Sequence, residues 1–305
     1  MEHKHWKKGL LSGFFFSALI IAVAGCSTAQ PADKTVEPAK QVATQETKVT
    51  QPKVPTMDEV PKGPEGEAIK LGYKLMNETN TVLKEHVGNQ LSCSSCHGAA
   101  GTDSTSSLVG VTAVYPKYIS RAGKVLTIED RINGCFQRSM NGKPLAYNSD
   151  EMRAMVAYLT YISKGVPTGT KERPWVVVND IPNPPTPNKE NGEKLYKQAC
   201  ASCHGADGSG TGPNSGPALW GKNSFNIGAG MARLGKAAGY IQRNMPLGEM
   251  GGIKQGTLTE QQAADLAAYI LSQERPDFGP KANDWPNGDA PKDVPYETNA
   301  KKAKN

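Results

Sequence analysis

The sequence predicts an all-α protein built from two tandem copies of one small domain. The hexapeptides CSSCHG (93–98) and CASCHG (200–205) repeat the same pattern of cysteines and histidine. Around each hexapeptide lie segments whose apolar residues recur at helical spacing. Each copy has roughly 90–110 residues, which is enough for one small hydrophobic core.

Four amphipathic segments supply the predicted helices, one ahead of each hexapeptide and one closing each copy. They are EGEAIKLGYKLM (65–76), NGEKLYKQA (191–199), SDEMRAMVAYLTYIS (149–163) and TLTEQQAADLAAYILSQ (257–273). The last segment places Gln262 three residues after Thr259, a capping-box pattern that marks the start of a helix. Both closing segments carry an alanine followed by a tyrosine, Tyr158 and Tyr269, which supports a repeat.

The hexapeptides contain Cys-x-x-Cys-His, the attachment motif of c-type haem. Two cysteines three residues apart can both reach the vinyl groups of the porphyrin, and the adjacent histidine can then reach the iron. We therefore expect two covalently bound haem c groups. The alternatives are a disulfide or structural zinc, but zinc more often joins two such motifs closely in one small module. The expected attachment residues are Cys93, Cys96, His97, Cys200, Cys203 and His204.

An opening helix, a haem motif, a loop region and a closing helix resemble the pattern of class I cytochromes c. In that family the first and last helices cross, and the haem lies in a cleft between loops. The resemblance implies two tandem class I cytochrome c domains. It also implies loop-rich middles, because the haem supplies much of each apolar core.

The first residues are typical of a secretory signal. MEHKHWKKGL is basic, and an apolar run too short for a comfortable membrane span follows it. Cys26 after small residues resembles the cleavage box of bacterial lipoproteins, so we expect a lipid anchor there. Ser27 stands where an aspartate would resemble an inner-membrane retention signal. The expected location is therefore the periplasm, anchored to the outer membrane; the alternative is an ordinary cleaved signal with an incidental cysteine.

The remaining polar, proline-rich stretches separate or flank the two domains. Residues 26–64 contain few large apolar side chains and cannot offset their conformational entropy by burial. The predicted organisation is a lipoprotein signal peptide (1–25), a disordered tether (26–64), cytochrome c domain 1 (65–170), a linker (171–187), cytochrome c domain 2 (188–277) and a C-terminal tail (278–305).

The net charge is +6 and the sequence pI is about 8.9. No basic run with interleaved aromatic residues is present in the sequence, so we expect no nucleic-acid partner. A mildly basic exported protein can attract small anions or acidic partners.

The second axial ligand of each iron sets its potential and its chemistry. In the second copy, YIQRNMPLG (240–248) places Met245 before a proline, which resembles the Met-Pro ligand loop of class I cytochromes. Met245 is therefore the expected ligand opposite His204. The alternatives are that Met245 is only a core residue, or that Met250 is the ligand.

The first copy offers two candidates. FQRSM (136–140) aligns with IQRNM (241–245), so the repeat favours Met140. However, Cys135 has no obvious disulfide partner, and a free cysteine in an oxidising compartment is a liability unless it is buried or used. A thiolate can bind ferric haem. From the residues alone, both Cys135 and Met140 are open.

Two segments resemble the thiosulfate dehydrogenases, a family of dihaem cytochromes c. They are RINGCFQRSMNGKPL (131–145) and GPALWGKNSFNIGAGMARLGKAAGYIQRNMP (216–246), and the resemblance covers residues 65–277. It implies Cys135 as the second ligand of the first haem. It further implies that Arg121, Arg131 and Ser139 contribute to the substrate pocket, where cations are needed because thiosulfate is a dianion. The alternative for each arginine is a solvated or haem-carboxylate-pairing side chain.

The resemblance implies a reaction as well. The family joins two thiosulfates into tetrathionate, and some members run the reverse. We expect Cys135 to carry a covalent sulfur intermediate, and electrons to pass from the first haem to the second and then to a small periplasmic acceptor such as a cytochrome c. Asn244, where some members have lysine, is similar to members that work well as tetrathionate reductases. Both directions stay open, and tetrathionate-rich conditions favour reduction.

Two other functions fit parts of the sequence. One is a dihaem electron carrier without substrate chemistry, in which Met140 and Met245 bind the two irons. The other is the cysteine-ligated haem subunit of a sulfur-oxidising complex, whose resemblance is confined to the segment around Cys135.

Overall fold

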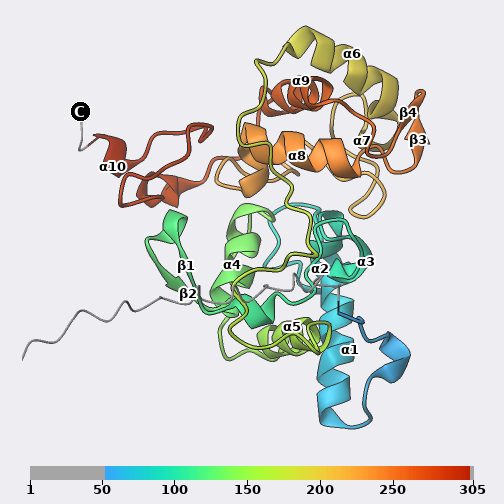
Figure 1. Ribbon diagram of the computed structural model, residues 1–305, viewed down its shortest axis with the longest axis vertical. Coiled ribbons are helices and arrows are strands. Elements are labelled where there is room, and N and C mark those ends of the chain that lie inside the picture. The colour runs from blue at the N-terminus through green and yellow to red at the C-terminus, as the bar shows by residue number, and fades with distance from the viewer. Residues whose placement is uncertain (1–51, 303–305) are drawn as a thin grey trace, which may run out of the picture. The chain divides into compact units, whose positions relative to one another are not determined.

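The computed structural model describes residues 52–302 (Figure 1). The predicted signal peptide, Cys26 and most of the predicted tether lie outside the described residues. Within the described range, no helix is both long enough and apolar enough to cross a membrane. Residues 52–302 are mostly helix and loop, with two small antiparallel hairpins, which confirms the all-α prediction.

The first domain is built from five helices and one hairpin. Its elements are α1 (Pro64–Asn77), α2 (Thr79–Val82), α3 (Gly98–Gly101), β1 (Lys117–Ile119), β2 (Lys124–Leu126), α4 (Ile128–Arg138) and α5 (Asp150–Tyr161). In the hairpin, Tyr118 is paired with Val125. Short 3-10 turns lie at Met57–Glu59, Cys93–Ser95, Thr112–Val114 and Ser120–Ala122.

The second domain also opens and closes with a long helix, but its hairpin follows the second-to-last helix, whereas the hairpin of the first domain precedes α4. Its elements are α6 (Lys189–Ala199), α7 (Ala201–His204), α8 (Leu234–Asn244), β3 (Glu249–Met250), β4 (Ile253–Lys254) and α9 (Glu260–Leu271). In its hairpin, Met250 is paired with Ile253. Further 3-10 turns lie at Gly230–Ala232 and Gly279–Asn283, and α10 (Asn299–Lys302) follows in the C-terminal segment. All four helices predicted from the amphipathic segments are present.

The opening and closing helices of each domain cross at a glycine. A Cβ at Gly72 of α1 would lie 2.1 Å from the carbonyl oxygen of Ala154 in α5. A Cβ at Gly192 of α6 would likewise lie 2.1 Å from the carbonyl oxygen of Asp265 in α9. Since no side chain larger than hydrogen fits at this separation, glycine lets the two backbones touch. The crossing expected from the class I cytochrome c resemblance is present in both copies.

Each crossing is followed by an apolar core. In the first domain the most deeply buried side chains come from α1, α4 and α5: Leu75, Phe136, Met152, Met155 and Tyr158. In the second domain Tyr196, Trp220 and Tyr269 form an aromatic cluster, with ring centroids 5.1 to 5.9 Å apart. The two repeated tyrosines, Tyr158 and Tyr269, therefore belong to equivalent positions beside the crossing glycines.

The segment between the domains and the segment after them both pack on folded structure. Arg173 and Trp175, within the predicted linker, donate hydrogen bonds to carbonyl oxygens of the first domain. In the C-terminal segment Trp285 is 3% exposed, and its backbone N–H donates to the carbonyl oxygen of Arg121 at 2.8 Å. Asp293 accepts two hydrogen bonds from Arg233 of the second domain. The C-terminal segment thus contacts both domains.

Candidate active site

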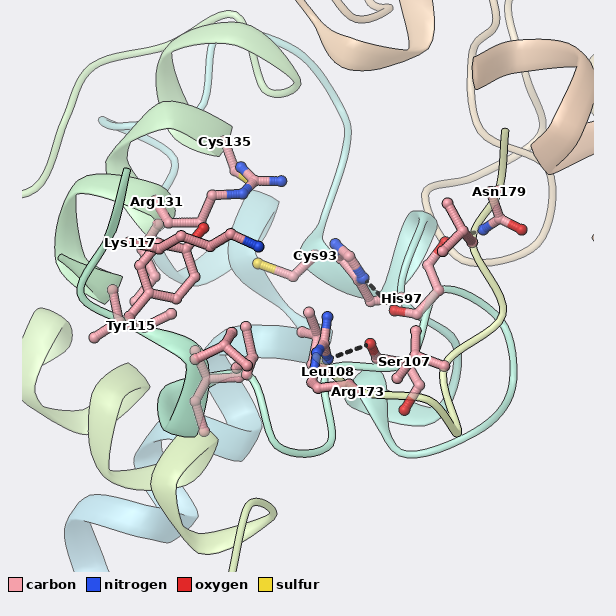
Figure 2. A pocket seen from close by; sticks show the side chains of 18 of the residues that line it. Cys93, His97, Ser107, Leu108, Tyr115, Lys117, Arg131, Cys135, Arg173 and Asn179 are labelled. Atoms are coloured by element: carbon pink, nitrogen blue, oxygen red, sulfur yellow. Dashed lines mark hydrogen bonds between the residues drawn. The ribbon is translucent and has the colours of Figure 1, made fainter. Parts of the chain in front are cut away.

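A cavity of about 810 Å³ opens in the first domain (Figure 2). Its wall contains Cys93 and His97 from the first haem motif and Cys135 from α4. Most of the remaining wall is apolar, and it includes Met76, Leu108, Ile132, Phe136, Met155 and Leu159. An apolar cavity with a histidine on one side and a cysteine on another matches what a haem needs from a protein.

The hydrogen bond of His97 leaves one of its ring nitrogens available to bind a metal. Its Nδ1 lies 2.7 Å from the carbonyl oxygen of Ser106, and a carbonyl can only accept a hydrogen bond. Nδ1 therefore carries the hydrogen, and the lone pair of Nε2 is available to an iron. Burial lowers the pKa of His97 to about 4, so the ring is neutral at physiological pH.

The cysteines of the motif are unlike a reactive redox pair. Burial raises the pKa of Cys93 to about 12 and that of Cys96 to about 11. Redox Cys-x-x-Cys pairs depend on a lowered thiol pKa, which these positions do not provide. Their position beside a cavity and a prepared histidine fits covalent haem attachment.

Cys135 lies on the cavity side of α4, next to a cation on the same helix. Thr127 caps the first turn of this helix by accepting a hydrogen bond from the N–H of Asp130. Arg131 then lies one helical turn before Cys135, on the same face. Its Nη1 donates to Cys135 Sγ at 2.9 Å, and both side chains line the cavity (Figure 2). The Cys135 sulfur raises the pKa of the Arg131 guanidinium.

Met140 also lines this cavity, just beyond the end of α4. It is 3% exposed and belongs to the apolar core of the first domain. Its N–H donates to the carbonyl oxygen of Cys135 at 2.9 Å. Both ligand candidates therefore face the same cavity, but only Cys135 has a cation on its sulfur.

A second cavity, of about 450 Å³, contains the second haem motif and is lined by residues of both domains. Cys200, Cys203, His204 and Met245 all line it. His204 Nδ1 lies 2.8 Å from the carbonyl oxygen of Pro217, so this ring too presents Nε2 to a metal. Burial lowers the pKa of His204. Met250, the other methionine considered for the iron, lines the same cavity.

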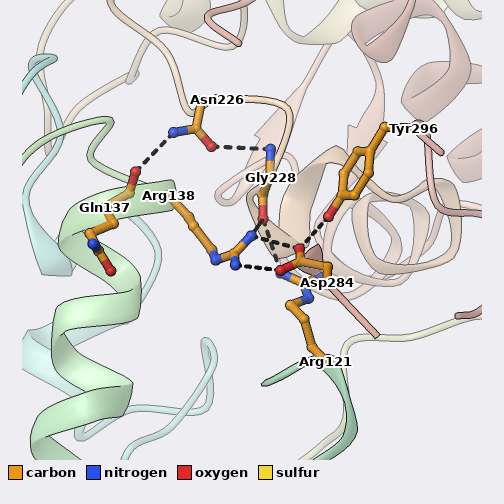
Figure 3. A network of polar contacts seen from close by, with 7 residues as sticks. All are labelled: Arg121, Gln137, Arg138, Asn226, Gly228, Asp284 and Tyr296. Carbon is orange, nitrogen blue, oxygen red and sulfur yellow. Dashed lines mark hydrogen bonds and ion pairs between the residues drawn. The ribbon is translucent and has the colours of Figure 1, made fainter. Parts of the chain in front are cut away.

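Two of the predicted substrate residues lie away from the first cavity wall. Arg121 donates to the carbonyl oxygen of Gly228 at 3.0 Å (Figure 3). Its guanidinium lies 4.7 Å from the centre of the Trp285 ring. Burial lowers the pKa of Arg121. Ser139 ends α4 and is half-buried, and its carbonyl oxygen accepts from Asn89. Of the predicted substrate residues, the structure brings Arg131 and Cys135 together.

Comparisons with known proteins agree with this architecture. Residues 81–168 match the family described as SoxA/TsdA, cytochrome c domain, and residues 189–274 match the cytochrome c family. A thiosulfate dehydrogenase of Psychrobacter arcticus is 42% identical over 79% of this chain and 74% of its own length. One from Allochromatium vinosum is 40% identical over 74% of this chain and 84% of its own length.

The chain belongs to the thiosulfate dehydrogenase family. A solved thiosulfate dehydrogenase (TsdBA) of Marichromatium purpuratum has the same fold, with a TM-score of 0.69 and 36% sequence identity over 74% of this chain. The present chain spans half the length of that solved chain. With two cytochrome c domains in this family, the protein carries two covalently bound c-type haems.

Sequence reasoning missed several cations of the thiosulfate dehydrogenase cavity. Arg173 and Lys171 come from the predicted linker, Lys117 from β1, and Lys236 from α8 of the second domain. No motif marks these positions, because each reaches the cavity only through the packing of its segment. The proline-rich composition of the linker does not predict that this segment lines the first cavity.

Proposed function

We propose that this chain oxidises two thiosulfate ions to tetrathionate in the cavity of the first domain, and that it can also run the reverse reduction. The observation that carries the proposal is the 2.9 Å contact from Arg131 Nη1 to Cys135 Sγ beside a haem-attachment motif. In this proposal His97 and Cys135 are the ligands of the first iron, and His204 and Met245 those of the second. The covalent attachments are made by Cys93, Cys96, Cys200 and Cys203.

The charge of the cavity supports a dianionic substrate. Arg131, Lys117, Lys171 and Lys236 contribute cations to its wall, and Lys236 is paired with Asp180 at 2.7 Å. Glu172 is the only acidic residue among the described lining residues. A cavity with such an excess of positive charge attracts sulfonate groups and holds them by charge-assisted hydrogen bonds.

The proposed cycle makes and breaks bonds at the Cys135 sulfur. The Cys135 sulfur, as thiolate, would form a bond to the terminal sulfur of one thiosulfate. This is a two-electron oxidation, and the two haems that His97 and His204 would hold can supply the electron acceptor. The product is a cysteine S-thiosulfonate. The terminal sulfur of a second thiosulfate then attacks the sulfur bonded to Cys135, which releases tetrathionate and restores the thiolate. Arg131 places a positive charge beside the sulfur that is negative before and after this cycle.

The route of the electrons is supported by a wall that the two domains share. Cys96, part of the first motif, lines the second cavity together with Tyr240 of α8. Ser95, also in the first motif, donates from Oγ to the carbonyl oxygen of Pro213 at 2.5 Å. We infer that electrons cross this wall to the second domain and then leave to a small periplasmic cytochrome c.

The direction and the location are parts of the same proposal. Asn244 is buried and donates to Tyr240 and to Asn179, so a neutral amide with defined partners precedes Met245. This is the position at which the family resemblance favours tetrathionate reduction. We place the protein in the periplasm, anchored to the outer membrane through a lipid on Cys26, as its first 26 residues predict.

The test uses the purified protein with both haems attached. Thiosulfate-dependent reduction of a chemical one-electron acceptor is compared between the wild type and Cys135→Gly. Wild-type turnover and an inactive variant that keeps both haems would support the proposal. If the wild type shuttles electrons from a chemical donor but does not respond to thiosulfate, the chain is an electron carrier.

A test of the isolated chain separates the proposed enzyme from the other candidate function, the cysteine-ligated haem subunit of a sulfur-oxidising complex. A subunit of a sulfur-oxidising complex needs its partner to act, whereas the proposed enzyme forms tetrathionate from thiosulfate without other proteins. Detecting tetrathionate in the reaction of the isolated chain decides between them.

A further inference from the structure

Arg173 is an arginine of the first cavity that has no acidic side chain as an ion-pair partner among the described residues. It lines the first cavity and is half-buried, and burial lowers its pKa. Among residues 52–302, none of the ion pairs at 4.0 Å or less includes Arg173. A guanidinium withdrawn from water without a counter-charge is costly to the folded state. Such a group is therefore expected to have an anionic partner when the cavity is filled.

Only one of the guanidinium nitrogens has described protein partners. Nη1 donates to the carbonyl oxygens of Ser107 at 3.0 Å and Val109 at 3.1 Å. No hydrogen bond in the described part of the chain uses its Nε or Nη2. Trp175 donates to the same Val109 carbonyl, and a Cβ at Gly110 would lie 2.8 Å from the Trp175 ring. The linker is therefore packed firmly against this loop, and the guanidinium has donors to spare.

The loop that holds Arg173 is the one that orients His97. Ser106, adjacent to Ser107, provides the carbonyl oxygen for His97 Nδ1. In Figure 2, Arg173 lies beside Ser107 and Leu108, whereas Arg131 lies beside Cys135. The two arginines thus serve different parts of the cavity, and a substrate that reacts at Cys135 has Arg131 as its cation.

We propose that Arg173 pairs with a carboxylate of the haem in the first cavity and thereby raises the reduction potential of that haem. Every haem of this type carries two propionate carboxylates, which are anions that enter the cavity with the cofactor. A cation held next to the haem favours the ferrous state, because reduction removes one positive charge from the iron. The linker then has a second role as a positioning element for the cofactor. This inference rests on the part of the proposed function that places a haem in the first cavity, and it does not need thiosulfate chemistry.

The test is a redox titration without substrate of the full chain carrying both haems. Arg173→Gln removes the charge, and Arg173→Lys retains it. We expect the Gln variant to shift the ferrous-to-ferric ratio of the first haem about tenfold toward ferric at a fixed applied potential, which is 59 mV for a one-electron couple. The Lys variant should restore most of the wild-type potential. The second haem, titrated in the same sample, should not change.

Arg275→Gln is the matched control. Arg275 is likewise an arginine that donates to backbone carbonyl oxygens, those of Leu219 and Ile270, but it lines neither haem cavity. It should leave the potential of the first haem unchanged. A shift as large as that of Arg173→Gln would overturn the proposal, because loss of any buried arginine would then suffice.

Three further outcomes of these measurements bear on the proposal. If Arg173→Gln and Arg173→Lys lower the potential equally, the effect comes from the lost Ser107 and Val109 contacts and not from charge, which overturns the proposal. If the potential is unchanged while the KM for thiosulfate rises, Arg173 binds substrate instead. Should the Gln variant lose its haem, a wild-type potential in Arg173→Lys supports the charge role and a lowered one opposes it. Haem content and thiosulfate turnover of the wild type are measured separately, so failure of the proposed function is recognised independently.

Discussion

The guanidinium of Arg138 pairs with the carboxylate of Asp284 through two hydrogen bonds, Nη2 to Oδ1 at 2.7 Å and Nη1 to Oδ2 at 2.8 Å (Figure 3). Arg138 is in the last turn of α4, the helix that carries Cys135, and Asp284 belongs to the C-terminal segment. The Asp284 side chain is 6% exposed and that of Arg138 20%. The C-terminal segment therefore holds the catalytic helix of the proposed mechanism in place.

The second domain contributes to the same anchor. Gly228 offers its carbonyl oxygen to both Arg121 and Arg138. Asn226 donates to the carbonyl oxygen of Gln137, and Tyr296 donates to Asp284 (Figure 3). Because these partners come from three distant parts of the chain, the orientation of α4 depends on the whole assembly of domains and C-terminal segment.

Replacing Asp284 by Asn should destabilise the protein by about 3–5 kcal/mol, because it leaves Arg138 largely buried without its counter-charge. The measurement is equilibrium chemical unfolding followed by circular dichroism. Asp150→Asn is the control, since it removes a carboxylate from an exposed pair with Arg153 and should cost less than about 1 kcal/mol. Equal losses in the two variants would mean that the Arg138 pair has no special role.

Arg131→Gln should lower the turnover of thiosulfate by about 10²-fold, the usual effect of removing one preorganised donor from a reacting centre. The reason is that Cys135 loses the cation at 2.9 Å from its sulfur. Steady-state reduction of a chemical acceptor gives the rate, and Arg153→Gln on the surface is the control. A variant that keeps full turnover would remove Arg131 from the mechanism.

Met245→Leu should remove the thioether ligand of the second iron and lower the potential of that haem, while both haems stay attached through their cysteines. Absorbance of the methionine-ligated ferric haem and a redox titration report the change. Met250→Leu, in the wall of the same cavity, should leave both signals intact. The reverse pattern would make Met250 the ligand.

Gly192→Ala should destabilise the second domain by about 1–3 kcal/mol, the range for forcing an extra methyl group into a packed contact. Its Cβ would lie 2.1 Å from the Asp265 carbonyl oxygen, so α6 and α9 would have to separate. Thermal unfolding of the haem-containing protein measures the effect. Gly230→Ala is the control, because nothing lies within 4 Å of its Cβ position. An unaffected Gly192→Ala variant would show that the crossing tolerates a wider spacing.

Local chemistry made much of this protein predictable. The four amphipathic helices and the two Cys-x-x-Cys-His motifs depend on residues close together in the sequence, so their positions could be read from it. The Arg131 and Cys135 pair is also local, since residues one helical turn apart share a face. Local sequence does not decide whether Cys135 or Met140 binds the first iron, because both lie within one turn of the end of α4 and both reach the cavity.

The sequence by itself determined the two-domain repeat, and it predicts the haem-attachment residues and Met245, because spacing along a single segment encodes each of them. It left Cys135 and Met140 both open, and the family resemblance favours Cys135. Only the tertiary structure decided that the linker forms part of the first cavity wall through Arg173, and that the C-terminal segment packs on α4, where Asp284 pairs with Arg138. It also decided that Arg121 packs on Trp285 away from the cavity wall. These contacts join residues separated by long stretches of chain, and polar, proline-rich segments carry no periodic pattern that would reveal which surface they cover. Their positions follow from burial and charge pairing in the folded protein.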